Sequence, residues 1–578
     1  MSQPTSLDFR NPNSLWCGVL VETLVRLGLR QAVISPGSRS APLTFALARH
    51  RRIEAIPVLD ERSAGFLALG LAKQRHRPVA LVCTSGTAAA NFLPAVVEAH
   101  ESGVPLLVLT ADRPPELRDC HSGQSIDQQE LYGGFVNLFQ EMPVPAANLG
   151  KLRGLRKLLE SAWKATALPM VGPVHLNCPF RDPLPPLPQA MPAEITGQAV
   201  RKVLLAGAGA SSLQDRASLG AKPRRPGTEP GVIVVGPNDP ASPRSFVAAV
   251  DRLARALGWP VLADALSPLR MDAAAAGPLV AHYDAILRNR KLADELQPRQ
   301  VICIGGWPTS KVLREWLQRA DPEVWLLTER TDNLDGLHLR TRHIRGEVEA
   351  WCRAHCGSRP LGTQGRRWLA EEKRVAAALG TALGRAKGLV EPAVVPVLSK
   401  HLPRGTPVFV ASSMPVRDME YFWPVSKGRQ RIVFSRGANG IDGTLSTALG
   451  LAHGNRPAVL LTGDLALLHD TNGFLSASKL RGSLTIILIN NHGGGIFEHL
   501  PVAQFDPPFE EFFATPQQVD FRSLCATYGV KHVAVTSLAQ FARLVANLPR
   551  NGVRVLELRT DRKHDAAFRK RLFASVAN

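Results

Sequence analysis

Short apolar runs alternate with longer amphipathic stretches along the first part of the chain. Four runs have the length and the Val, Ile and Leu content of buried strands, at residues 31–35, 55–59, 79–84 and 106–110. Stretches of helical length lie before and between them, at residues 15–29, 40–50, 61–74 and 88–102. This alternation is typical of a parallel sheet with helices on both faces.

The same alternation recurs twice further along the chain. A proline-rich stretch, residues 183–192, is typical of a stiff linker and follows the first α/β region. A second region contains the apolar runs 232–235, 260–262 and 301–304. A third begins with a long helical stretch near Trp368, and a chain of 578 residues has room for about three domains. The predicted fold class is therefore α/β, with three domains that are each a mainly parallel sheet flanked by helices, at residues 1–190, 191–365 and 366–578.

An acidic residue and an amide residue stand at the ends of two apolar runs in the third region. Residues 458–461 and 484–489 predict neighbouring strands, with a helix over 470–481 between them. Asp464 and Asn491, 27 positions apart, then lie at the carboxyl ends of parallel strands, which is the ligand-binding edge of an open α/β sheet. With the Gly493 carbonyl they form an oxygen-only set that suits Mg²⁺, or alternatively Mn²⁺, completed by diphosphate oxygens and water.

This region resembles a known cofactor signature. The motif TGDL at 462–465, followed by NN at 490–491, is similar to the GDG and NN signature of thiamine-diphosphate enzymes, with Leu465 in place of the third glycine. Together with five further motifs, it resembles the family of 2-succinyl-5-enolpyruvyl-6-hydroxy-3-cyclohexene-1-carboxylate synthases. Those motifs are SPGSRSAP (35–42), DERSAGF (60–66), TSGTAAANF (84–92), TADRPPELRDC (110–120) and RGANGIDG (436–443).

The resemblance implies a reaction and a cofactor. It implies that the protein decarboxylates 2-oxoglutarate on thiamine diphosphate and adds the succinyl-semialdehyde carbanion to isochorismate, a step of menaquinone or phylloquinone biosynthesis. Glu61 matches the glutamate that bonds the pyrimidine ring and tautomerises it, so that the cofactor's own imino nitrogen acts as the base. The ordinary alternative for Glu61 is an acidic residue in the first turn of a helix, stabilised by the helix dipole.

The resemblance also implies further contacts to the cofactor. Ile441 matches the apolar wedge that bends the cofactor, although packing in the core is an equal alternative. Ser412 and Ser413 follow a predicted strand, where they either contact the diphosphate or cap a helix. The full cofactor set implied is Glu61, Ser412, Ser413, Ile441, Gly463, Asp464 and Asn491.

Both implied substrates are dianions, so the site needs several fixed cations. Arginine binds carboxylates with a planar fork and suits this role better than lysine. Four arginines lie inside family motifs in loops after strands and are expected to act in catalysis and substrate binding: Arg39, Arg113, Arg417 and Arg436. Their alternative is a surface or interface salt bridge.

Other positions match substrate contacts of the family. Ser38 and Gln124 match residues that hydrogen-bond the ring substrate, and Lys311 looks like a lysine that reaches the site from the middle domain. Ile496, Phe497 and Leu500, after the predicted metal loop, match an apolar wall that excludes water. Two departures bear on these contacts: Val312 stands where an arginine is often found, and Gly123 where an asparagine is often found. His492 is expected to be a solvent-facing loop residue rather than a catalytic one.

Glu61 and Asp464 lie about 400 residues apart, on different predicted domains, yet the resemblance gives both to one cofactor. In the family the interface between subunits brings these groups together. We therefore expect self-association, as a dimer or a dimer of dimers.

The charge and the hydropathy of the chain bear on which partners and which location are expected. The formal net charge is +20, but the basic residues are spread along the chain and are not interleaved with stacking aromatics, so a nucleic-acid partner is not expected. No apolar run approaches the roughly 18 residues of a membrane span, and the start lacks a secretory signal, so the prediction is a cytoplasmic protein without a membrane partner.

Cys352 and Cys356 flank His355, but no second pair follows at zinc-ligand spacing. The glycine-rich segment 207–212 lacks the third glycine of a dinucleotide fingerprint and is expected to be a mobile loop.

Two other functions stay open at this point. An acetolactate-type carboligase is the nearer alternative, but it would have fewer arginines at the site and often a flavin-binding middle domain. An inactive basic scaffold is the other, and the joint presence of Glu61, Asp464 and Asn491 argues against it.

Overall fold

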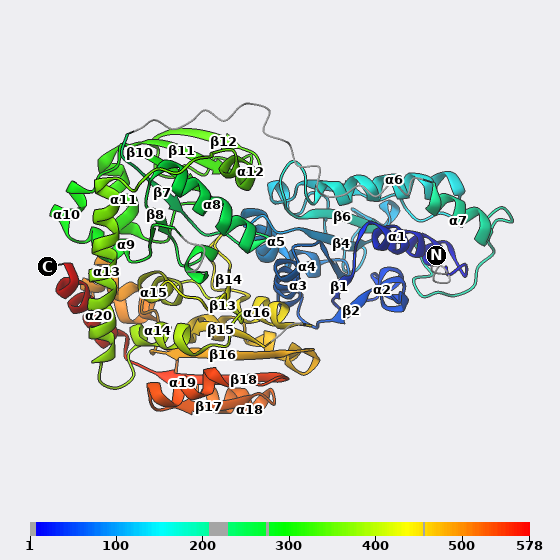
Figure 1. Cartoon of the computed structure of the whole chain (residues 1–578). Helices are drawn as coiled ribbons and strands as arrows, with labels where there is room; N and C mark the ends of the chain where they lie inside the picture. The colour runs from blue at the N-terminus through cyan, green and yellow to red at the C-terminus, as the bar shows by residue number, and fades with distance from the viewer. Residues whose placement is uncertain (1–6, 207–228, 273–276, 455–456, 578) are drawn as a thin grey trace. The chain divides into compact units, whose positions relative to one another are not determined.

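The computed structural model describes residues 7–206, 229–272, 277–454 and 457–577. The glycine-rich segment 207–212 lies outside the described residues. Within them, the chain forms three six-stranded sheets in which every paired strand is parallel (Figure 1). Helices flank each sheet, which confirms the predicted α/β fold class.

The first sheet has the strand order β2-β1-β3-β4-β6-β5. Its strands are β1 (Gln31–Ile34), β2 (Glu54–Pro57), β3 (Val79–Cys83), β4 (Leu106–Asp112), β5 (Leu138–Glu141) and β6 (Val174–Pro179). Its helices are α1 (Pro12–Leu27), α2 (Ala41–Arg49), α3 (Glu61–Arg75), α4 (Thr87–Ala90), α5 (Leu93–Glu101), α6 (Leu149–Ala165) and α7 (Gly197–Leu205). Every residue of β1, β3, β4 and β6 is buried, because helices cover both faces.

The second sheet has the strand order β12-β11-β10-β7-β8-β9. Its strands are β7 (Gly231–Val235), β8 (Val261–Ala263), β9 (Leu279–Val280), β10 (Gln300–Ile304), β11 (Glu323–Thr328) and β12 (Arg340–Arg345). The accompanying helices are α8 (Pro243–Leu257), α9 (Tyr283–Leu287), α10 (Arg290–Glu295), α11 (Lys311–Ala320) and α12 (Val348–Arg353).

The third sheet has the strand order β14-β13-β15-β16-β18-β17. Its strands are β13 (Pro407–Val410), β14 (Arg431–Phe434), β15 (Ala458–Gly463), β16 (Ser483–Asn490), β17 (Lys531–Val535) and β18 (Gly552–Arg559). The helices from this part of the chain are α13 (Thr363–Gly384), α14 (Glu391–His401), α15 (Met414–Phe422), α16 (Thr444–Ala452), α17 (Asp464–His469), α18 (Phe521–Thr527), α19 (Leu538–Ala546) and α20 (Arg562–Ala577).

The connection between β15 and β16 differs from the predicted helix over 470–481. The structure has the short helix α17 followed by a 3₁₀ segment, Thr471–Lys479. The Asp470 side chain accepts hydrogen bonds from the Ser446 amide at 2.7 Å and from its hydroxyl at 3.0 Å. Because this carboxylate is committed to another segment, the chain breaks its α-helical path there.

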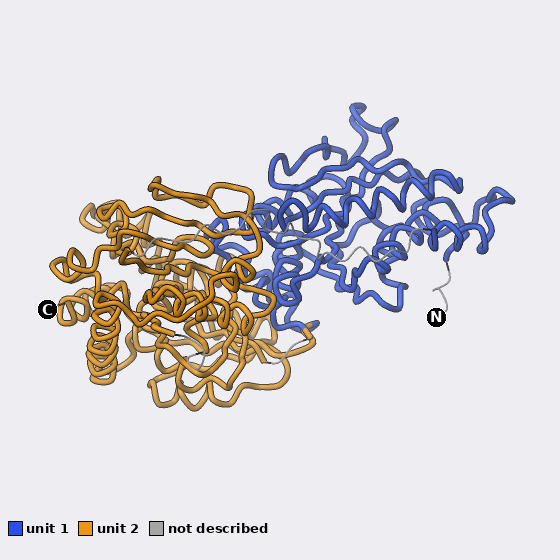
Figure 2. The backbone as a smooth tube through the Cα atoms, turned by 45° about the horizontal axis from the view of Figure 1, so that its top comes forward, with its two compact units in different colours: residues 1–215, 435–453, 470–479 blue, residues 216–434, 454–469, 480–578 orange. Residues whose placement is uncertain are grey.

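The chain divides into two compact units (Figure 2). Unit 1 contains Met1–Asp215, Ser435–His453 and Asp470–Lys479, and unit 2 contains the rest of the chain. Unit 1 therefore holds the first sheet together with α16, and unit 2 holds the second and third sheets.

Two helices of unit 1, α3 and α16, cross with their backbones in direct contact. A Cβ atom at Gly70 would overlap the Thr447 carbonyl oxygen and would lie 3.0 Å from the Gly450 Cα. A Cβ atom at Gly450 would likewise overlap the Leu67 carbonyl oxygen. The crossing thus requires glycine on both helices.

A buried ionic cluster ties α1 to the end of α2. Glu22 is 3% exposed and accepts hydrogen bonds from Arg26 at 2.8 Å and from His50 at 3.0 Å, with Arg52 at 3.3 Å. Burial alone would raise the pKa of Glu22, but the hydrogen bonds from His50 and Arg26 outweigh it and lower that pKa to about 2.

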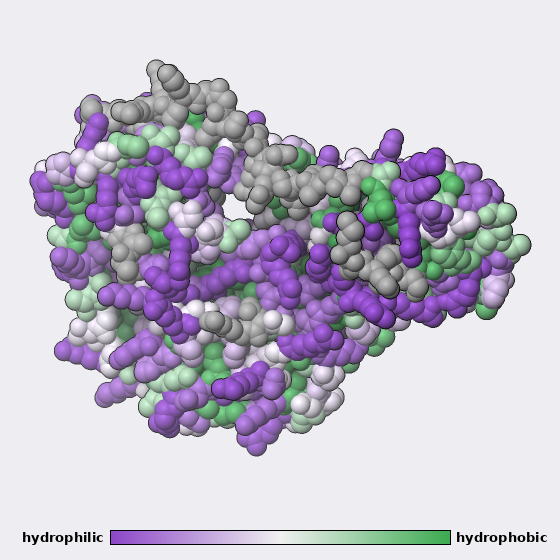
Figure 3. All heavy atoms as spheres, turned by 45° about the vertical axis from the view of Figure 1, so that its right-hand side comes forward, coloured by the Kyte–Doolittle hydropathy of each residue, from purple (hydrophilic) through white to green (hydrophobic). Residues whose placement is uncertain are grey.

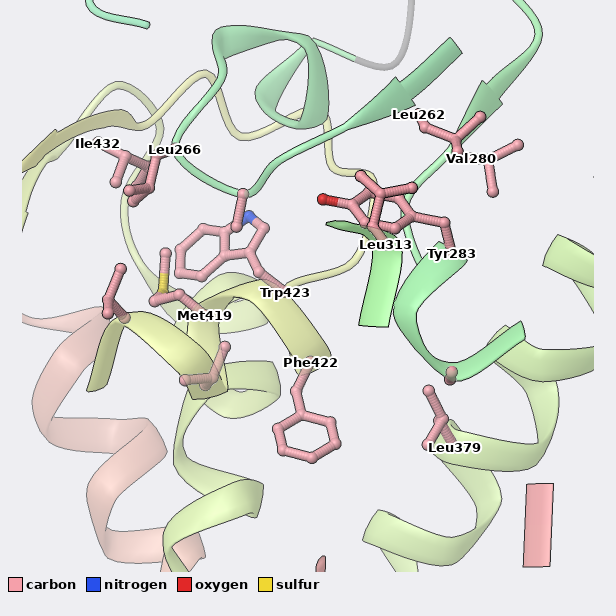
Figure 4. Packing of buried hydrophobic residues seen from close by; sticks show 14 of the residues in the cluster. Leu262, Leu266, Val280, Tyr283, Leu313, Leu379, Met419, Phe422, Trp423 and Ile432 are labelled. Carbon is pink, nitrogen blue, oxygen red and sulfur yellow. The ribbon is translucent and has the colours of Figure 1, made fainter. Parts of the chain in front are cut away.

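In unit 2 the second and third sheets share one hydrophobic core. Figure 4 shows Met419 and Trp423, from α15 and the residue after it, in the same cluster as Tyr283 of α9 and Leu313 of α11. Arg270 is fully buried beside this core and donates hydrogen bonds to the carbonyl oxygens of Ala263, Ala281, Glu420 and Trp423. It also lies 3.2 Å from the Glu420 carboxylate. The buried charge is tolerated because its donors are satisfied.

Hydrophilic residues cover most of the face shown in Figure 3, and hydrophobic residues form smaller patches on it. Within the described ranges, no helix is both long and apolar enough to cross a bilayer. Cys352 is buried and Cys356 is exposed, and the described residues contain no group of three or more His, Cys, Asp or Glu side chains that could hold a metal ion.

Candidate active site

Three adjacent strands of the third sheet carry candidate residues at their carboxyl ends. Ser412 and Ser413 follow β13, Asp464 follows β15 directly, and Asn491 follows β16. The Gly493 amide donates to Asp464 Oδ2 at 2.8 Å, so the loop after β16 lies against the end of β15. The structure thus brings together at one sheet edge the residues that the sequence separates by 27 positions.

The oxygen atoms at this edge fit a hard divalent cation. Asp464 is 4% exposed, and burial raises its pKa to about 6 although the Leu465 and Gly493 amides oppose the shift. Asn491 is 5% exposed, and its Oδ1 has no hydrogen-bond partner among the described residues. A buried acceptor without a partner costs about 1–3 kcal/mol, and a cation would remove that cost.

Glycine is required at position 493. Its φ is +126°, which favours glycine, and a Cβ atom there would overlap the Ala514 carbonyl oxygen. The neighbouring His492 is exposed, as expected for a loop histidine. Its carbonyl oxygen accepts a hydrogen bond from Arg562 at 2.7 Å, which fixes the loop from the side of α20.

The segment before α15 is held in an unusual conformation. Ser413 has a φ of 72° and a ψ of −132°, a backbone region that strains a residue with a side chain. Arg417, one turn along α15, donates to the Ser413 carbonyl oxygen at 2.7 Å, and burial lowers the pKa of Arg417. Gly463 has open space around its Cα, with no heavy atom within 4 Å of a Cβ built there. These residues leave room at the sheet edge next to Asp464.

The apolar residues after the Gly493 loop are only partly covered. Ile496 and Phe497 are half-buried, and the Phe497 ring packs edge-to-face against Phe513 at 5.8 Å. Leu500 is 43% exposed. Lys311 begins α11 with its side chain exposed, and its Nζ lies 3.4 Å from Glu315.

In unit 1, Glu61 begins α3, and Asp60 caps this helix. Asp60 accepts a hydrogen bond from the Ser63 amide at 3.2 Å, and its other oxygen accepts from Asn472 at 2.7 Å. Glu61 is half-buried and lies close to Cys83 at the end of β3. Burial, together with the Glu61 charge, raises the pKa of the Cys83 thiol well above its usual range.

The turn that carries Ile441 packs against the same helix. A Cβ atom at Gly443, whose φ is +61°, would overlap the Phe66 ring of α3. At the start of this segment, the Gly437 and Ala438 amides donate to Glu98 at 3.2 and 2.7 Å. Arg436 and Ile441 are both half-buried. The structure therefore places Ile441 and Glu61 in one compact unit.

Arg113 and Gln124 meet at Ser85, a residue that we did not single out from the sequence. Arg113 donates to Ser85 Oγ at 3.4 Å and to the Gly123 carbonyl at 2.5 Å, while Gln124 donates to the Ser85 carbonyl at 2.8 Å. Ser85 is 1% exposed and follows β3 inside the TSGTAAANF motif. Its place two residues after the end of a buried strand was the signal that could have identified it.

Arg39 and Ser38 lie after β1. Arg39 is 8% exposed, donates to the Phe180 carbonyl at 2.9 Å and lies 3.7 Å from Asp182. Burial and the charge of Arg113 lower the pKa of Arg39. Ser38 is exposed. Arg39 and Arg113 are thus positioned by backbone carbonyl groups, with guanidinium capacity left for an anion.

Comparisons with known proteins identify the class of enzyme. The thiamine pyrophosphate enzyme N-terminal TPP binding domain matches residues 18–131, the middle domain of thiamine pyrophosphate matches 224–410, and the C-terminal TPP binding domain matches 414–558. Among solved structures, benzoylformate decarboxylase from Polynucleobacter necessarius aligns with a TM-score of 0.66 at 16% identity, over 95% of this chain and 98% of that one. The protein is therefore a thiamine-diphosphate-dependent enzyme.

Close relatives narrow the class to one family. The 2-succinyl-5-enolpyruvyl-6-hydroxy-3-cyclohexene-1-carboxylate synthase of Synechococcus elongatus is 50% identical over 99% of this chain and 97% of its own length. The synthase of the same name from Trichormus variabilis is also 50% identical, over 97% of both chains. The chain belongs to the family of these synthases.

Proposed function

We propose that the protein decarboxylates 2-oxoglutarate and joins the remaining four-carbon unit to isochorismate, which gives 2-succinyl-5-enolpyruvyl-6-hydroxy-3-cyclohexene-1-carboxylate and carbon dioxide. This is a step of menaquinone or phylloquinone biosynthesis. Relatives at 50% identity over nearly the whole chain, named for this product, support the proposal. The structural observation that carries it is the buried edge at which Asp464, the orphaned Asn491 Oδ1 and the Gly493 loop meet.

In this proposal, Mg²⁺ is the resident metal, with Mn²⁺ as the alternative, and its protein ligands are Asp464, Asn491 and the Gly493 carbonyl. Ser412, Ser413 and Gly463 line the diphosphate because they share the same sheet edge. Bound thiamine diphosphate supplies the electron sink that the decarboxylation needs. The chain's part at this end is to hold a doubly charged group in place, with a buried carboxylate as the principal anionic ligand.

Glu61 is proposed to exchange a proton with the pyrimidine ring. Glu61 begins α3, is half-buried and lies beside the apolar end of β3. This position reduces competition from water for that proton. Ile441 is proposed to press on the cofactor from the turn that packs on the same helix. The two residues share one compact unit, so their mutual placement is fixed by the α3 and α16 crossing.

The substrate carboxylates are proposed to bind arginines: Arg39, Arg113, Arg417 and Arg436. Arg39, Arg113 and Arg417 each donate to a backbone carbonyl oxygen, which restricts their side chains before substrate arrives. Ser38, Gln124 and Lys311 are assigned to the ring substrate and Ile496, Phe497 and Leu500 to the apolar wall. The exposed fraction of Leu500 fits a wall that substrate or another subunit completes.

We further propose the domain boundaries 1–190, 191–365 and 366–578, a cytoplasmic location, and assembly as a dimer or a dimer of dimers. The assembly follows from the assignment of one cofactor to Glu61 in unit 1 and Asp464 in unit 2. Sedimentation equilibrium measures it directly, and a monomer that is fully active would refute it.

The decisive experiment is a two-substrate assay. Protein, Mg²⁺, thiamine diphosphate and 2-oxoglutarate are combined with and without isochorismate. We expect carbon dioxide release and loss of isochorismate absorbance in equal amounts. Carbon dioxide release with pyruvate but no consumption of isochorismate would overturn the proposal in favour of another 2-oxoacid carboligase.

A further inference from the structure

We propose that a second ligand site, separate from the one above, lies in unit 2 and binds a phosphate monoester carried on an apolar ring. The site is a cavity of about 640 Å³ at the carboxyl ends of β7 and β8. Its lining comes from the segments 238–247, 266–272, 404–405 and 429–432. None of the residues assigned to the active site lines it, so its ligand is independent of the proposed reaction.

Four arginines line the cavity, and two of them have free guanidinium groups. Arg431 pairs with Asp239 at 2.7 Å, and Arg429 pairs with Asp272 at 3.0 Å. The other two, Arg244 and Arg404, are exposed and make no ion pair or side-chain hydrogen bond with the described residues. Two unpaired guanidinium groups at one cavity attract a dianion more strongly than a single carboxylate.

The amino terminus of α8 adds two hydrogen-bond donors. This 15-residue helix begins at Pro243, and its N-cap residue, Ser242, makes no side-chain capping bond. The first helical amide with a partner is that of Phe246, which donates to the Ser242 carbonyl at 3.1 Å. The Arg244 and Ser245 amides are therefore available, within the described structure, at the positive end of the helix.

A buried amide in the lining gives independent support for a ligand. Gln430 is 3% exposed, and neither its Oε1 nor its Nε2 has a hydrogen-bond partner in the described part of the chain. The Nδ2 atom of Asn238 is also buried without a partner among the described residues. Buried polar atoms are normally satisfied, so this concentration of unmet donors and acceptors around one cavity is explained by a polar ligand.

Apolar side chains form much of the remaining lining. Leu266 and Ile432 lie together in Figure 4, and both line the cavity. Val247 and Met271 line it too, as do three prolines at positions 240, 243 and 268. A volume of this size suits a ligand of several rings rather than a lone ion. The arginines and the helix terminus would hold the phosphate, and the apolar side chains would hold the ring.

Adenosine monophosphate is the probe for the test, because it joins a dianionic phosphate to a flat ring. Isothermal titration calorimetry is performed on the full-length protein saturated with Mg²⁺ and thiamine diphosphate, so that the cofactor site is already filled. We expect adenosine monophosphate to bind about tenfold or more tightly than either adenosine or inorganic phosphate. No binding of the nucleotide, or equal binding of inorganic phosphate, would overturn the proposal.

Arginine variants locate the binding. Arg404→Gln and Arg244→Gln should each weaken binding of the nucleotide about tenfold or more, because each removes a charge-assisted contact. Arg252→Gln is the matched control: Arg252 is exposed on the same helix, α8, but does not line the cavity. Both cavity positions are exposed, so their variants are expected to fold, which an unchanged melting temperature verifies. Unaltered affinity in both cavity variants would refute the site.

Discussion

Replacing Gly70 by alanine tests the crossing of α3 and α16. The added Cβ would overlap the Thr447 carbonyl oxygen and would lie 2.9 Å from the Thr447 carbonyl carbon. Both opposing atoms belong to backbone, so neither can rotate away as a side chain would. The two helices must therefore move apart, and the side chains packed around the crossing lose contact.

The expected change in the free energy of unfolding is the sum of two opposing effects. Overpacking of this kind costs about 1–3 kcal/mol, and a clash with backbone belongs at the upper end of that range. Replacing glycine by alanine inside a helix stabilises the folded state by about 1 kcal/mol. We therefore expect Gly70→Ala to lower the free energy of unfolding of unit 1 by about 2 kcal/mol, or its melting temperature by about 4–8 °C.

Gly154→Ala is the control for this experiment. Gly154 lies inside α6 of the same unit, and a Cβ built there meets no heavy atom within 4 Å. This variant should be more stable than the parent by about 0.5–1 kcal/mol. Both proteins are compared by calorimetry and by denaturation in urea. Equal gains in stability for Gly70→Ala and Gly154→Ala would show that the two backbones are not in contact.

Three further predictions address the site and the two units. Glu61→Gln should nearly abolish turnover while calorimetry still detects cofactor binding; wild-type rates would exclude its proposed role. The lowered pKa of Glu22 stabilises unit 1 above about pH 4.5, and this contribution disappears as the pH falls to about 2. Glu22→Gln should thus cost about 2 kcal/mol at neutral pH and little near pH 2 in urea titrations. Arg270→Met should cost about 3–5 kcal/mol, because the buried Glu420 carboxyl and the four carbonyl oxygens that accept from Arg270 lose their partner; unchanged urea unfolding would contradict this.

The fold was predictable because parallel strands buried on both faces leave a plain signal in the sequence. The run 458–461 corresponds to β15 and the run 484–489 to β16, and their parallel pairing puts Asp464 and Asn491 at one edge. The same reasoning failed for residues 470–481, since the use of the Asp470 carboxylate by Ser446 depends on a contact that no local pattern contains.

Side-chain contacts made to distant backbone atoms were beyond sequence reasoning. Ser85 became visible as a common partner of Arg113 and Gln124 only when the loops after β3 and β4 were seen together. The cavity beside α8 was even harder to predict from the sequence, because its lining combines residues 238 and 432, which are almost 200 positions apart. Tertiary packing, rather than periodicity, creates such sites.

Unit 1 is built from three separate segments of the chain, and this affects how the protein folds during its synthesis. Its three pieces are interrupted by parts of unit 2, and the last piece ends at Lys479. During synthesis the amino-terminal sheet emerges first, but α16, which ends at Ala452, reaches it only after more than three-quarters of the polypeptide has left the ribosome. Gene fragments that stop at the proline-rich stretch 183–192 will therefore yield a protein with an uncovered α3, prone to aggregate, whereas a fragment ending beyond Lys479 supplies the missing helix.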